Sequence, residues 1–452
     1  MRQLRISEVG LRGVVGTGLT AQHVIDFATA FATYLRTPGP VVVGRDPRAS
    51  SEMLRQGVLS GLMACGRDVI DLGLVSTPVL QHAIQRFDAA GGVSIGASHN
   101  TAEWNALKFF GREGSYLATA EANELLDIYH LRRFSYADWP EIGKLRLNND
   151  AVDWYLDQLA TVFDFEAIRR YRVVADCCNG TSALILQRMI DRFQLPLILI
   201  NAQMRGVSFA HDPATTRETA GLQLAPLMKP LNADAGFLFD VDSDRIAVAT
   251  EQGIAISEEL VLPLLSDYLL PKAAGKVIVT NLSTTALLEW IAAKHGGRVA
   301  RVPVGRQAAA DAIATYRPGE IALAGEGTGA VMMPQFRFVY DGIASMLGIL
   351  SFMAESGKTL SRILSEYPEY SIVKGQIPLV TKRIPRLLMD LREQYSNGVA
   401  NTSDGLRVDW EDRWFHVRVS QTEPIVRVIC EQRGAAPTEL YNALVDQIQG
   451  FA

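Results

Sequence analysis

Three segments of this chain look like copies of one unit, and this repeat limits the fold more than any other feature of the sequence. Each copy opens with the pattern of a strand, a polar turn and a helix: GPVVVGRDPRASSEMLRQGV, RVVADCCNGTSALILQRM and KVIVTNLSTTALLEWIA. Two further apolar runs follow in each copy: DVIDLG then GGVSIGAS, LPLILI then AGFLFDVD, and GRVARV then EIALAGEG. Short Val- and Ile-rich runs that alternate with helical patterns indicate parallel strands joined by helices. We therefore expect three related βαβαβ units over residues 40–110, 172–250 and 276–338.

The last 85 residues have a different pattern, in which short alternating stretches follow one another through tight turns. That pattern is typical of a small antiparallel sheet with flanking helices. The expected elements are a strand over Tyr370–Pro378, a helix over Ile384–Tyr395, strands over Leu406–Asp409, Trp414–Val419 and Ile425–Glu431, and a helix over Thr438–Phe451. The predicted fold class is α/β, with three related mixed α/β domains and a C-terminal α+β domain. We place the four domains at residues 1–150, 151–250, 251–367 and 368–452.

Composition and charge exclude several classes of protein. Lys and Arg number 44 against 49 Asp and Glu, which gives a net charge of −5, so neither nucleic acid nor a membrane is an expected partner. The start MRQLRISEVG lacks the apolar core of a signal peptide, and no apolar stretch reaches about 18 residues. Four cysteines without a CxxC pair argue against a zinc ribbon or a disulfide framework. We expect a soluble, cytoplasmic protein.

Each repeat carries a polar cluster directly after its third strand. These clusters are Ser-His-Asn at 98–100, Asp-Val-Asp-Ser-Asp-Arg at 240–245 and Gly-Glu-Gly-Thr-Gly at 325–329. Ligands of open α/β sheets bind beyond the carboxyl ends of the strands. Three equivalent strand ends are therefore expected to face one shared site.

The middle cluster has the chemistry of a metal site. In FLFDVDSDRIAVA, Asp240, Asp242 and Asp244 alternate along an expected extended segment, which places their carboxylates on one face. Three like charges on one face repel unless a cation neutralises them, and oxygen ligands suit Mg²⁺. A solvated acidic turn without a metal is the alternative. Arg245 beside them either binds a phosphate oxygen or pairs with one of the acids.

The first cluster contains a candidate nucleophile. Ser98 follows a buried strand at a tight turn, and it is either a nucleophile, a phosphate ligand or a helix cap. Lys108 is a nearby candidate cation, and His99 is either functional or a hydrogen-bonded structural histidine. Earlier in the same repeat, we expect Arg45 and Asp46 to form a structural pair and not to bind a ligand.

Two further segments supply groups that bind hydroxyls or anions. GEGTG offers one acid and one hydroxyl on a flexible loop. In RVSQTEPIVRV, Arg418, Ser420 and Thr422 fall on one side of an expected extended segment, with Arg427 behind them. Guanidinium and hydroxyl groups in this arrangement favour a phosphate-binding segment over an ordinary polar strand face. Together, the serine, the acidic cluster and these two segments predict metal-assisted phosphoryl transfer on a small polyol phosphate.

Taken in their order along the chain, the motifs resemble those of the α-D-phosphohexomutases, which include phosphoglucosamine, phosphomanno- and phosphoglucomutases. LRGVVG resembles the N-terminal loop of that family, and VGRDPRASS the strand and turn that follow. GASHN resembles its phosphoserine loop, DVDSDR its metal loop, GEGTG its sugar-binding loop and RVSQTEPIVR its phosphate-binding loop. The resemblance runs the whole length of the chain. It implies four domains around a central cleft, three of them related α/β units, in agreement with the repeat.

The resemblance also implies a role for each matching residue. Ser98 is expected to carry a phosphoryl group, and Asp240, Asp242 and Asp244 to bind one Mg²⁺ per chain together with that group. The further catalytic candidates are Arg12, His99, Lys108 and Arg245. The residues expected to bind substrate are Glu326, Thr328, Arg418, Ser420, Gln421, Thr422 and Arg427.

The implied reaction moves a phosphate between positions 1 and 6 of a hexose. Phosphoserine gives its phosphoryl group to the free hydroxyl of a sugar phosphate, the 1,6-bisphosphate turns around, and its other phosphate returns to Ser98. A hexose 1,6-bisphosphate is therefore the expected activator, and a small sugar phosphate the expected partner of a monomer or homodimer. Phosphoglucosamine mutase is the first expectation, because GEGTG is followed by the apolar run VMMP. A phosphomannomutase/phosphoglucomutase is the alternative.

The chain departs from the family pattern in three places. Thr101 stands where proline usually follows SHN, SEVGLRG stands where FGTSGxRG is usual, and Ala330 stands where a histidine usually follows the sugar loop. Thr328 keeps the hydroxyl of that loop, so these changes bear on which sugar is preferred. Two other classes are alternatives. A non-catalytic sugar-phosphate-binding protein would need no metal loop, and a haloacid-dehalogenase-type phosphatase would need no Ser98.

Overall fold

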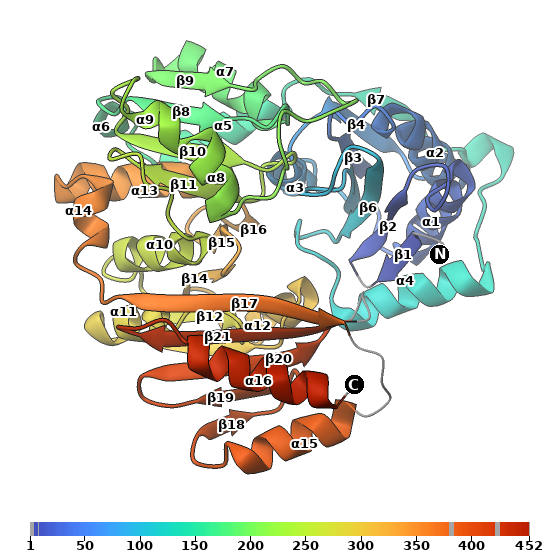
Figure 1. Ribbon diagram of the computed structural model, residues 1–452. Helices are drawn as coiled ribbons and strands as arrows, with labels where there is room; N and C mark the ends of the chain where they lie inside the picture. Colours follow the sequence, from blue (N-terminus) through green and yellow to red (C-terminus); the bar gives the residue numbers. More distant parts are fainter. Residues whose placement is uncertain (1–3, 8, 379–383, 421–424, 452) are drawn as a thin grey trace.

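The computed structural model describes residues 4–7, 9–378, 384–420 and 425–451, which form four sheets that follow one another along the chain (Figure 1). Each sheet lies inside one of the four predicted segments, while the points at which one domain ends and the next begins stay a prediction. Within the described residues, no helix combines the length and the apolar composition needed to cross a membrane.

The first sheet has seven strands in the order β1-β2-β6-β5-β3-β4-β7. Its strands are β1 (Leu4–Ser7), β2 (Gly10–Val14), β3 (Val41–Arg45), β4 (Val69–Leu74), β5 (Gly91–Ile95), β6 (Trp104–Phe110) and β7 (Leu145–Leu147). The helices of this segment are α1 (Ala21–Tyr34), α2 (Ser51–Ala64), α3 (Thr77–Arg86) and α4 (Thr119–Leu131).

The second sheet has the order β11-β10-β8-β9 and the third has the order β13-β12-β14-β15-β16. The second segment contains α5 (Ala151–Val162), α6 (Phe165–Ile168), β8 (Val173–Asp176), α7 (Ser182–Phe193), β9 (Leu197–Ile200), α8 (Arg217–Gln223), α9 (Ala225–Met228), β10 (Ala235–Phe239) and β11 (Ile246–Thr250). The third contains α10 (Val261–Leu269), β12 (Val277–Asn281), α11 (Leu287–Lys294), β13 (Arg298–Val302), α12 (Arg306–Ala314), β14 (Ile321–Glu326), β15 (Ala330–Met333), β16 (Arg337–Tyr340), α13 (Gly342–Ser356) and α14 (Leu360–Leu364).

The three sheets contain the same arrangement of strands, which confirms the predicted repeat. In each, three parallel strands lie in the spatial order third, first, second: β5-β3-β4, β10-β8-β9 and β14-β12-β13. An antiparallel strand, β6, β11 or β15, then pairs with the third strand. The first two predicted polar clusters lie in the connections between the third strand and this antiparallel strand, and the third cluster covers the last two residues of β14 and the turn that follows. The repeat therefore places the candidate functional loops at equivalent positions.

The fourth sheet is antiparallel, in the order β17-β21-β20-β19-β18, as expected for a C-terminal α+β domain. Its elements are β17 (Tyr370–Pro378), α15 (Ile384–Gln394), β18 (Val399–Asn401), β19 (Leu406–Asp409), β20 (Arg413–Val419), β21 (Ile425–Arg433) and α16 (Thr438–Gly450). The sequence analysis missed β18, because this short edge strand is largely exposed and has no apolar alternation.

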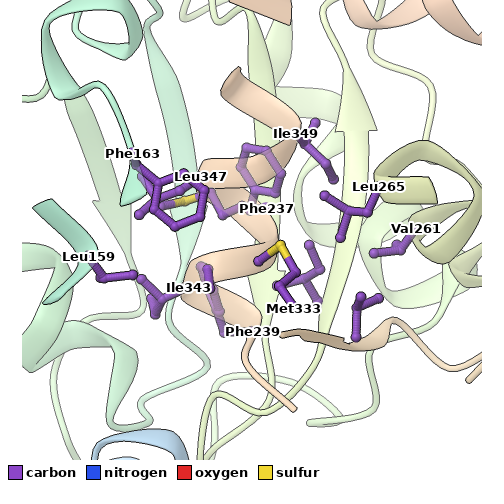
Figure 2. Packing of buried hydrophobic residues seen from close by; sticks show 14 of the residues in the cluster. Leu159, Phe163, Phe237, Phe239, Val261, Leu265, Met333, Ile343, Leu347 and Ile349 are labelled. Carbon is purple, nitrogen blue, oxygen red and sulfur yellow. The ribbon is translucent and has the colours of Figure 1, made fainter. Parts of the chain in front are cut away.

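The second and third segments share one hydrophobic core built around α13. Figure 2 shows Ile343 and Leu347 of this helix beside Phe237 of β10, with Leu265 of α10 and Met333 of β15 nearby. All five side chains are almost fully buried. A core that includes side chains from two sheets fixes the sheets relative to each other. The loops at their strand ends are thereby held in a defined relation.

Candidate active site

Ser98 lies in the connection between β5 and β6, in a left-handed backbone conformation with φ of 47°. This conformation is unfavourable for a residue with a side chain, and such residues gather at functional sites. The next element is a strand, so the helix-cap alternative for Ser98 is excluded. The Ser98 hydroxyl donates a hydrogen bond of 2.5 Å to Oδ2 of Asp240 in the β10–β11 connection. The first two predicted clusters therefore meet at this contact.

Arg48 holds the Ser98 turn in place. Its side chain is fully buried and its guanidinium donates to the backbone carbonyls of Ser98 (2.8 Å), Asn100 (2.8 Å) and Thr101 (2.6 Å). The Nε atom of Arg48 donates to Asp46 at 2.8 Å. A rigid planar fork that binds three carbonyls of one turn fixes its backbone, and with it the direction of the serine side chain.

This arrangement corrects the predicted pairing of Arg45 with Asp46. Asp46 pairs with Arg48, whereas Arg45 forms an ion pair of 3.0 Å with Glu52 on α2. Arg45 is the last residue of β3 and Asp46 follows it, so neighbouring side chains diverge. The partner of Asp46 is the arginine two residues later.

The acidic cluster forms through a turn and not through an extended segment. β10 ends at Phe239, and the N–H of Ser243 donates to the carbonyl of Asp240 at 3.1 Å. Ser243 has a φ of 64°, which reverses the chain. The three carboxylates still converge, with one oxygen of each within 4.8 Å of the others. The predicted cluster is present, but the predicted local geometry was wrong.

Asp240 uses its two oxygens for different partners. Oδ1 accepts the backbone N–H groups of Asp244 (3.1 Å) and Arg245 (3.3 Å), which closes the turn around it. Oδ2 accepts the hydroxyl of Ser98. Burial, followed by the charges of Asp244 and Asp242, raises the pKa of Asp240 well above its usual value. Asp240 is therefore the carboxyl that most needs a cation in order to ionise.

Asp242 and Asp244 each have one oxygen bound by protein donors from another segment. Oδ2 of Asp242 accepts the Thr77 hydroxyl at 2.6 Å and the Lys108 ammonium, and Oδ2 of Asp244 accepts Arg306 at 2.8 Å. The Oδ1 atoms of Asp242 and Asp244 are buried and accept no hydrogen bond from the described residues. Buried carboxylate oxygens without donors are costly, and two of them beside Asp240 fit a hard divalent cation such as Mg²⁺.

Cations from three segments surround the acidic cluster. Burial is the largest single effect on the pKa of Lys108 and would lower it, but the charges of Asp242, Tyr116 and Asp244 together outweigh burial and raise that pKa. Burial likewise opposes ionisation of Asp244, but Arg306, then Lys108 and Arg245, lower its pKa. Asp244 and Lys108 therefore stay charged at neutral pH, and a cluster that also holds a metal can bind a strongly negative group.

His99 and Arg12 flank the Ser98 turn. Nδ1 of His99 lies 3.4 Å from the Ser98 hydroxyl. The charge of Arg245, and then burial, lower the pKa of His99 to about 3, so the imidazole is neutral at neutral pH. Arg12, on β2, donates to the Asn100 side chain at 3.0 Å. The structure therefore places both predicted residues beside the serine.

The third predicted cluster lies in the turn between β14 and β15, directly against the acidic loop. The N–H of Ile246 donates to the carbonyl of Gly329 at 3.1 Å, and a Cβ on Gly329 would lie 2.0 Å from the Ile246 carbonyl oxygen. Glu326 accepts the Tyr340 hydroxyl at 3.3 Å, and the Thr328 hydroxyl is buried without a hydrogen-bond partner among the described residues. Glu326 and Thr328 thus offer polar groups beside the acidic loop.

The C-terminal candidates form a separate group on the fourth sheet. Arg418 of β20 is buried and lies directly opposite Arg427 of β21, so both side chains leave the same face. Nε of Arg418 donates to Asp404 at 2.9 Å. Within the described residues, Arg418 forms no hydrogen bond or ion pair with the Ser98 turn. Ser420 belongs to the hairpin end, where its N–H donates to the Ile425 carbonyl at 2.9 Å. Gln421 and Thr422 lie outside the described residues.

The sequence analysis missed several residues of this site. They are Arg48, Thr77, Arg306, Tyr340 and Lys374, the last of which joins β17 to Glu259 (2.8 Å) and to the Gly327 carbonyl (3.4 Å). Thr77 and Arg306 follow the second strands of their repeats, β4 and β13. The strand-end argument that selected the third strands would have found both, had it been applied to the second strands as well.

Comparison with known families assigns most of the chain. The families described as "Phosphoglucomutase/phosphomannomutase, alpha/beta/alpha domain I", "domain II" and "domain III" match residues 5–135, 153–253 and 258–370. A "Phosphoglucomutase/phosphomannomutase" of Thermococcus kodakarensis is 32% identical over 96% of each chain. A "Phosphoglucosamine/phosphogalactosamine mutase" of Sulfurisphaera tokodaii is 30% identical over 97% of each.

Solved structures share the fold. A phosphoglucomutase/phosphomannomutase family protein of Burkholderia thailandensis superposes with a TM-score of 0.85 at 23% identity, over 98% of this chain and 97% of that one. An N-acetylphosphoglucosamine mutase of Aspergillus fumigatus, solved with GlcNAc-6P and magnesium, has a TM-score of 0.60 at 14% identity, over 94% and 97%. At these identities the likeness is one of fold.

The open carboxylate oxygens predict divalent-cation binding. Asp242→Asn should weaken Mg²⁺ binding by about tenfold or more, because one negative ligand is lost while its volume is kept. Isothermal titration of the metal-stripped chain measures this, with circular dichroism to verify folding. Asp191→Asn, at an exposed acid on α7, is the matched control and should leave the affinity unchanged. Equal affinities of the Asp242→Asn and unaltered chains would contradict the assignment.

Proposed function

This chain belongs to the phosphoglucomutase/phosphomannomutase family of α-D-phosphohexomutases, and we propose that it interconverts the 1-phosphate and the 6-phosphate of a hexose through a phosphoserine at Ser98. The observation that carries this proposal is the Ser98 hydroxyl, held in a strained turn and bonded to one of three buried aspartates. Neither of the two alternative classes, a sugar-phosphate-binding protein or a dehalogenase-type phosphatase, explains this placement of Ser98. A binding protein needs no serine aimed at an acidic cluster, and a dehalogenase-type phosphatase would use an aspartate as its nucleophile.

Ser98 carries the phosphoryl group between the two half-reactions. The bond from phosphorus to Ser98 Oγ breaks while one forms to the free sugar hydroxyl, and the proton of that hydroxyl finally resides on Ser98 Oγ. The resulting Ser98 hydroxyl keeps this proton and donates a hydrogen bond to Asp240, as in the contact described above. The second half-reaction runs the same exchange in reverse on the other end of the bisphosphate. Arg48 keeps Oγ in place throughout, because its bonds are to the backbone of the turn.

We assign one Mg²⁺ per chain to Asp240, Asp242 and Asp244, bound together with the phosphate on Ser98. When bound, the ion offsets charge on the transferring phosphoryl group. Thr77 and Lys108 bind Oδ2 of Asp242, and Arg306 binds Oδ2 of Asp244, which orients both carboxylates and leaves their Oδ1 atoms for the ion. Arg245, Arg12 and His99 surround the same turn, as the catalytic candidates of this proposal.

Substrate binding is divided between the third and fourth segments. Glu326 and Thr328 bind sugar hydroxyls, while Arg418, Ser420 and Arg427, with Gln421 and Thr422, hold the phosphate that does not react. Nε of Arg418 already donates to Asp404, so we assign its two Nη groups to the phosphate. Lys374 ties the fourth segment to the sugar loop at Gly327, which keeps the two binding regions together.

A hexose 1,6-bisphosphate is the proposed activator, because it supplies the phosphoryl group that charges Ser98. The division into domains at 150, 250 and 367, the monomeric or homodimeric state and the cytoplasmic location remain predictions.

Glucosamine phosphate is the proposed substrate, with glucose and mannose phosphates as the alternatives. The relative from Sulfurisphaera tokodaii is named for amino sugars and the one from Thermococcus kodakarensis for neutral sugars. A coupled assay with a trace of bisphosphate should give the largest kcat/KM for glucosamine phosphate. A larger value for glucose or mannose phosphate would overturn the sugar assignment and leave the mutase proposal intact.

Phosphorylation of Ser98 is predicted to be essential. Peptide mass analysis should find about 80 Da added to part of the peptide that contains Ser98. Ser98→Ala should lower kcat by several orders of magnitude, because the covalent step is lost. Ser60→Ala, at an exposed serine of α2, is the control and should retain full activity. Near-normal turnover by Ser98→Ala would refute the mechanism.

Arg418→Ala tests the phosphate-binding segment. If Arg418 holds the phosphate that does not react, it acts in both half-reactions, so kcat/KM should fall for the 1-phosphate and the 6-phosphate alike. Loss of one charge-assisted contact predicts a fall of about 10- to 150-fold. Arg413→Ala, at an exposed arginine of the same strand, is the control. A loss confined to one isomer would instead indicate a contact with the sugar.

A further inference from the structure

A cavity of about 440 Å³ lies between the first and third segments. None of the residues that form the serine turn, the acidic cluster or the sugar loop lines it. We call it the interdomain cavity. Its walls come from α3 and the connection after β6 on one side, and from α12, β15 and β16 on the other. The volume falls in the range of small-molecule sites.

Most of the wall is apolar and partly aromatic. The side chains that give it this character are Ile313, Met332, Phe336, Phe338 and Val339. On α12, Ala310 leaves room, because its side chain is a single methyl group where the cavity follows the helix. An apolar, preferably aromatic, body therefore fits this space.

Arg337 brings a positive charge to the cavity without an acidic partner of its own. Its Nε donates to Nδ1 of His82 at 2.7 Å, and it forms no ion pair with any carboxylate in the described part of the chain. Burial, and then the charges of Arg337 and Arg86, lower the pKa of His82 to about 4, so His82 is neutral at neutral pH. Glu113 also lines the cavity and acts on Arg337 only through space. A half-buried guanidinium that forms no direct ion pair favours an anion in contact with it.

A second guanidinium, that of Arg306, forms part of the same wall. Its Cζ atom lies 5.1 Å from the ring centre of Tyr116 and 4.9 Å from that of Tyr340. Its Nη2 donates to Asp244. The cavity thus has two arginines and one glutamate among its charged lining residues. Because Asp244 already pairs with Arg306, Arg337 is the charge that favours an anionic head, while the apolar wall favours an apolar body.

We propose that the interdomain cavity is a second ligand site, which binds a small amphiphilic anion with its acidic head at Arg337 and its aromatic body against α12 and β16. The cavity shares Arg306 and Tyr340 with the candidate active site, but none of the residues proposed to bind sugar or phosphate lines it, so the proposal does not depend on the proposed reaction. Because Arg306 lines the cavity and also holds Asp244, an occupant touches the residue that orients a metal ligand.

The test uses the fluorescence of 8-anilinonaphthalene-1-sulfonate, an aromatic anion that brightens in apolar sites. The full chain with Mg²⁺ should bind it saturably. Arg337→Gln should weaken its affinity by about tenfold or more, because a charge-assisted contact is lost. The same substitution should affect the uncharged analogue N-phenyl-1-naphthylamine far less. Arg317→Gln, at an exposed arginine of the same segment, is the control and should change neither.

Two further measurements locate the probe. Ala310→Trp should abolish saturable binding by filling the cavity, and thermal unfolding verifies that this variant folds; if it does not, Arg337→Gln decides. Saturating glucosamine 6-phosphate should leave the probe bound. The proposal is overturned if no saturable binding occurs, if Arg337→Gln binds both probes like the unaltered chain, or if glucosamine 6-phosphate displaces the anion.

Discussion

Mutual repulsion of three aspartates, buried within 4.8 Å of one another, is the constraint on which the rest of this structure depends. Such a cluster is stable only where positive charge offsets it. The offsetting groups come from three segments of the chain: Lys108 from the first, Arg245 from the second and Arg306 from the third. The segments must therefore be assembled for the cluster to persist, and the site exists only in the complete arrangement. The two buried carboxylate oxygens that accept no hydrogen bond from the described residues fit the proposed divalent cation, which would complete this balance of charge.

The repeated unit explains how one chain brings these groups to one place. In each copy the connection after the third parallel strand carries the polar cluster, and the residues after the second strand add Thr77 and Arg306. Hydrogen bonds between loops of different copies, such as Ser98 to Asp240 and Ile246 to Gly329, hold these strand ends next to one another. The antiparallel fourth segment has a different proposed role. Its paired arginines are suited to a phosphate, and Lys374 attaches it to the sugar loop.

Much of this architecture follows from local patterns in the sequence, and the remainder depends on pairings between distant segments. Apolar runs and turns predicted the repeat and the bounds of β17 and β19, and the strand-end argument selected Ser98 and the three aspartates. The predicted partner of Asp46 was wrong, because Asp46 pairs with Arg48, two residues later, and not with its neighbour Arg45. The aspartates were expected along a strand, yet a positive φ at Ser243 folds them into a turn. Arg306 follows the second strand of its repeat, a position that was not considered, and its contact with Asp244 joins residues more than sixty positions apart in the sequence.

The central claim is that Ser98 passes its phosphoryl group to the sugar and receives the other phosphate of the bisphosphate within one turnover. The most direct measurement is a rapid-quench chase, in which the chain labelled with radioactive phosphate on Ser98 is mixed with unlabelled glucosamine 6-phosphate and Mg²⁺. The account predicts that the label leaves Ser98 and appears in a hexose bisphosphate at a rate no slower than steady-state turnover. Label that stays on Ser98 while product accumulates would contradict it.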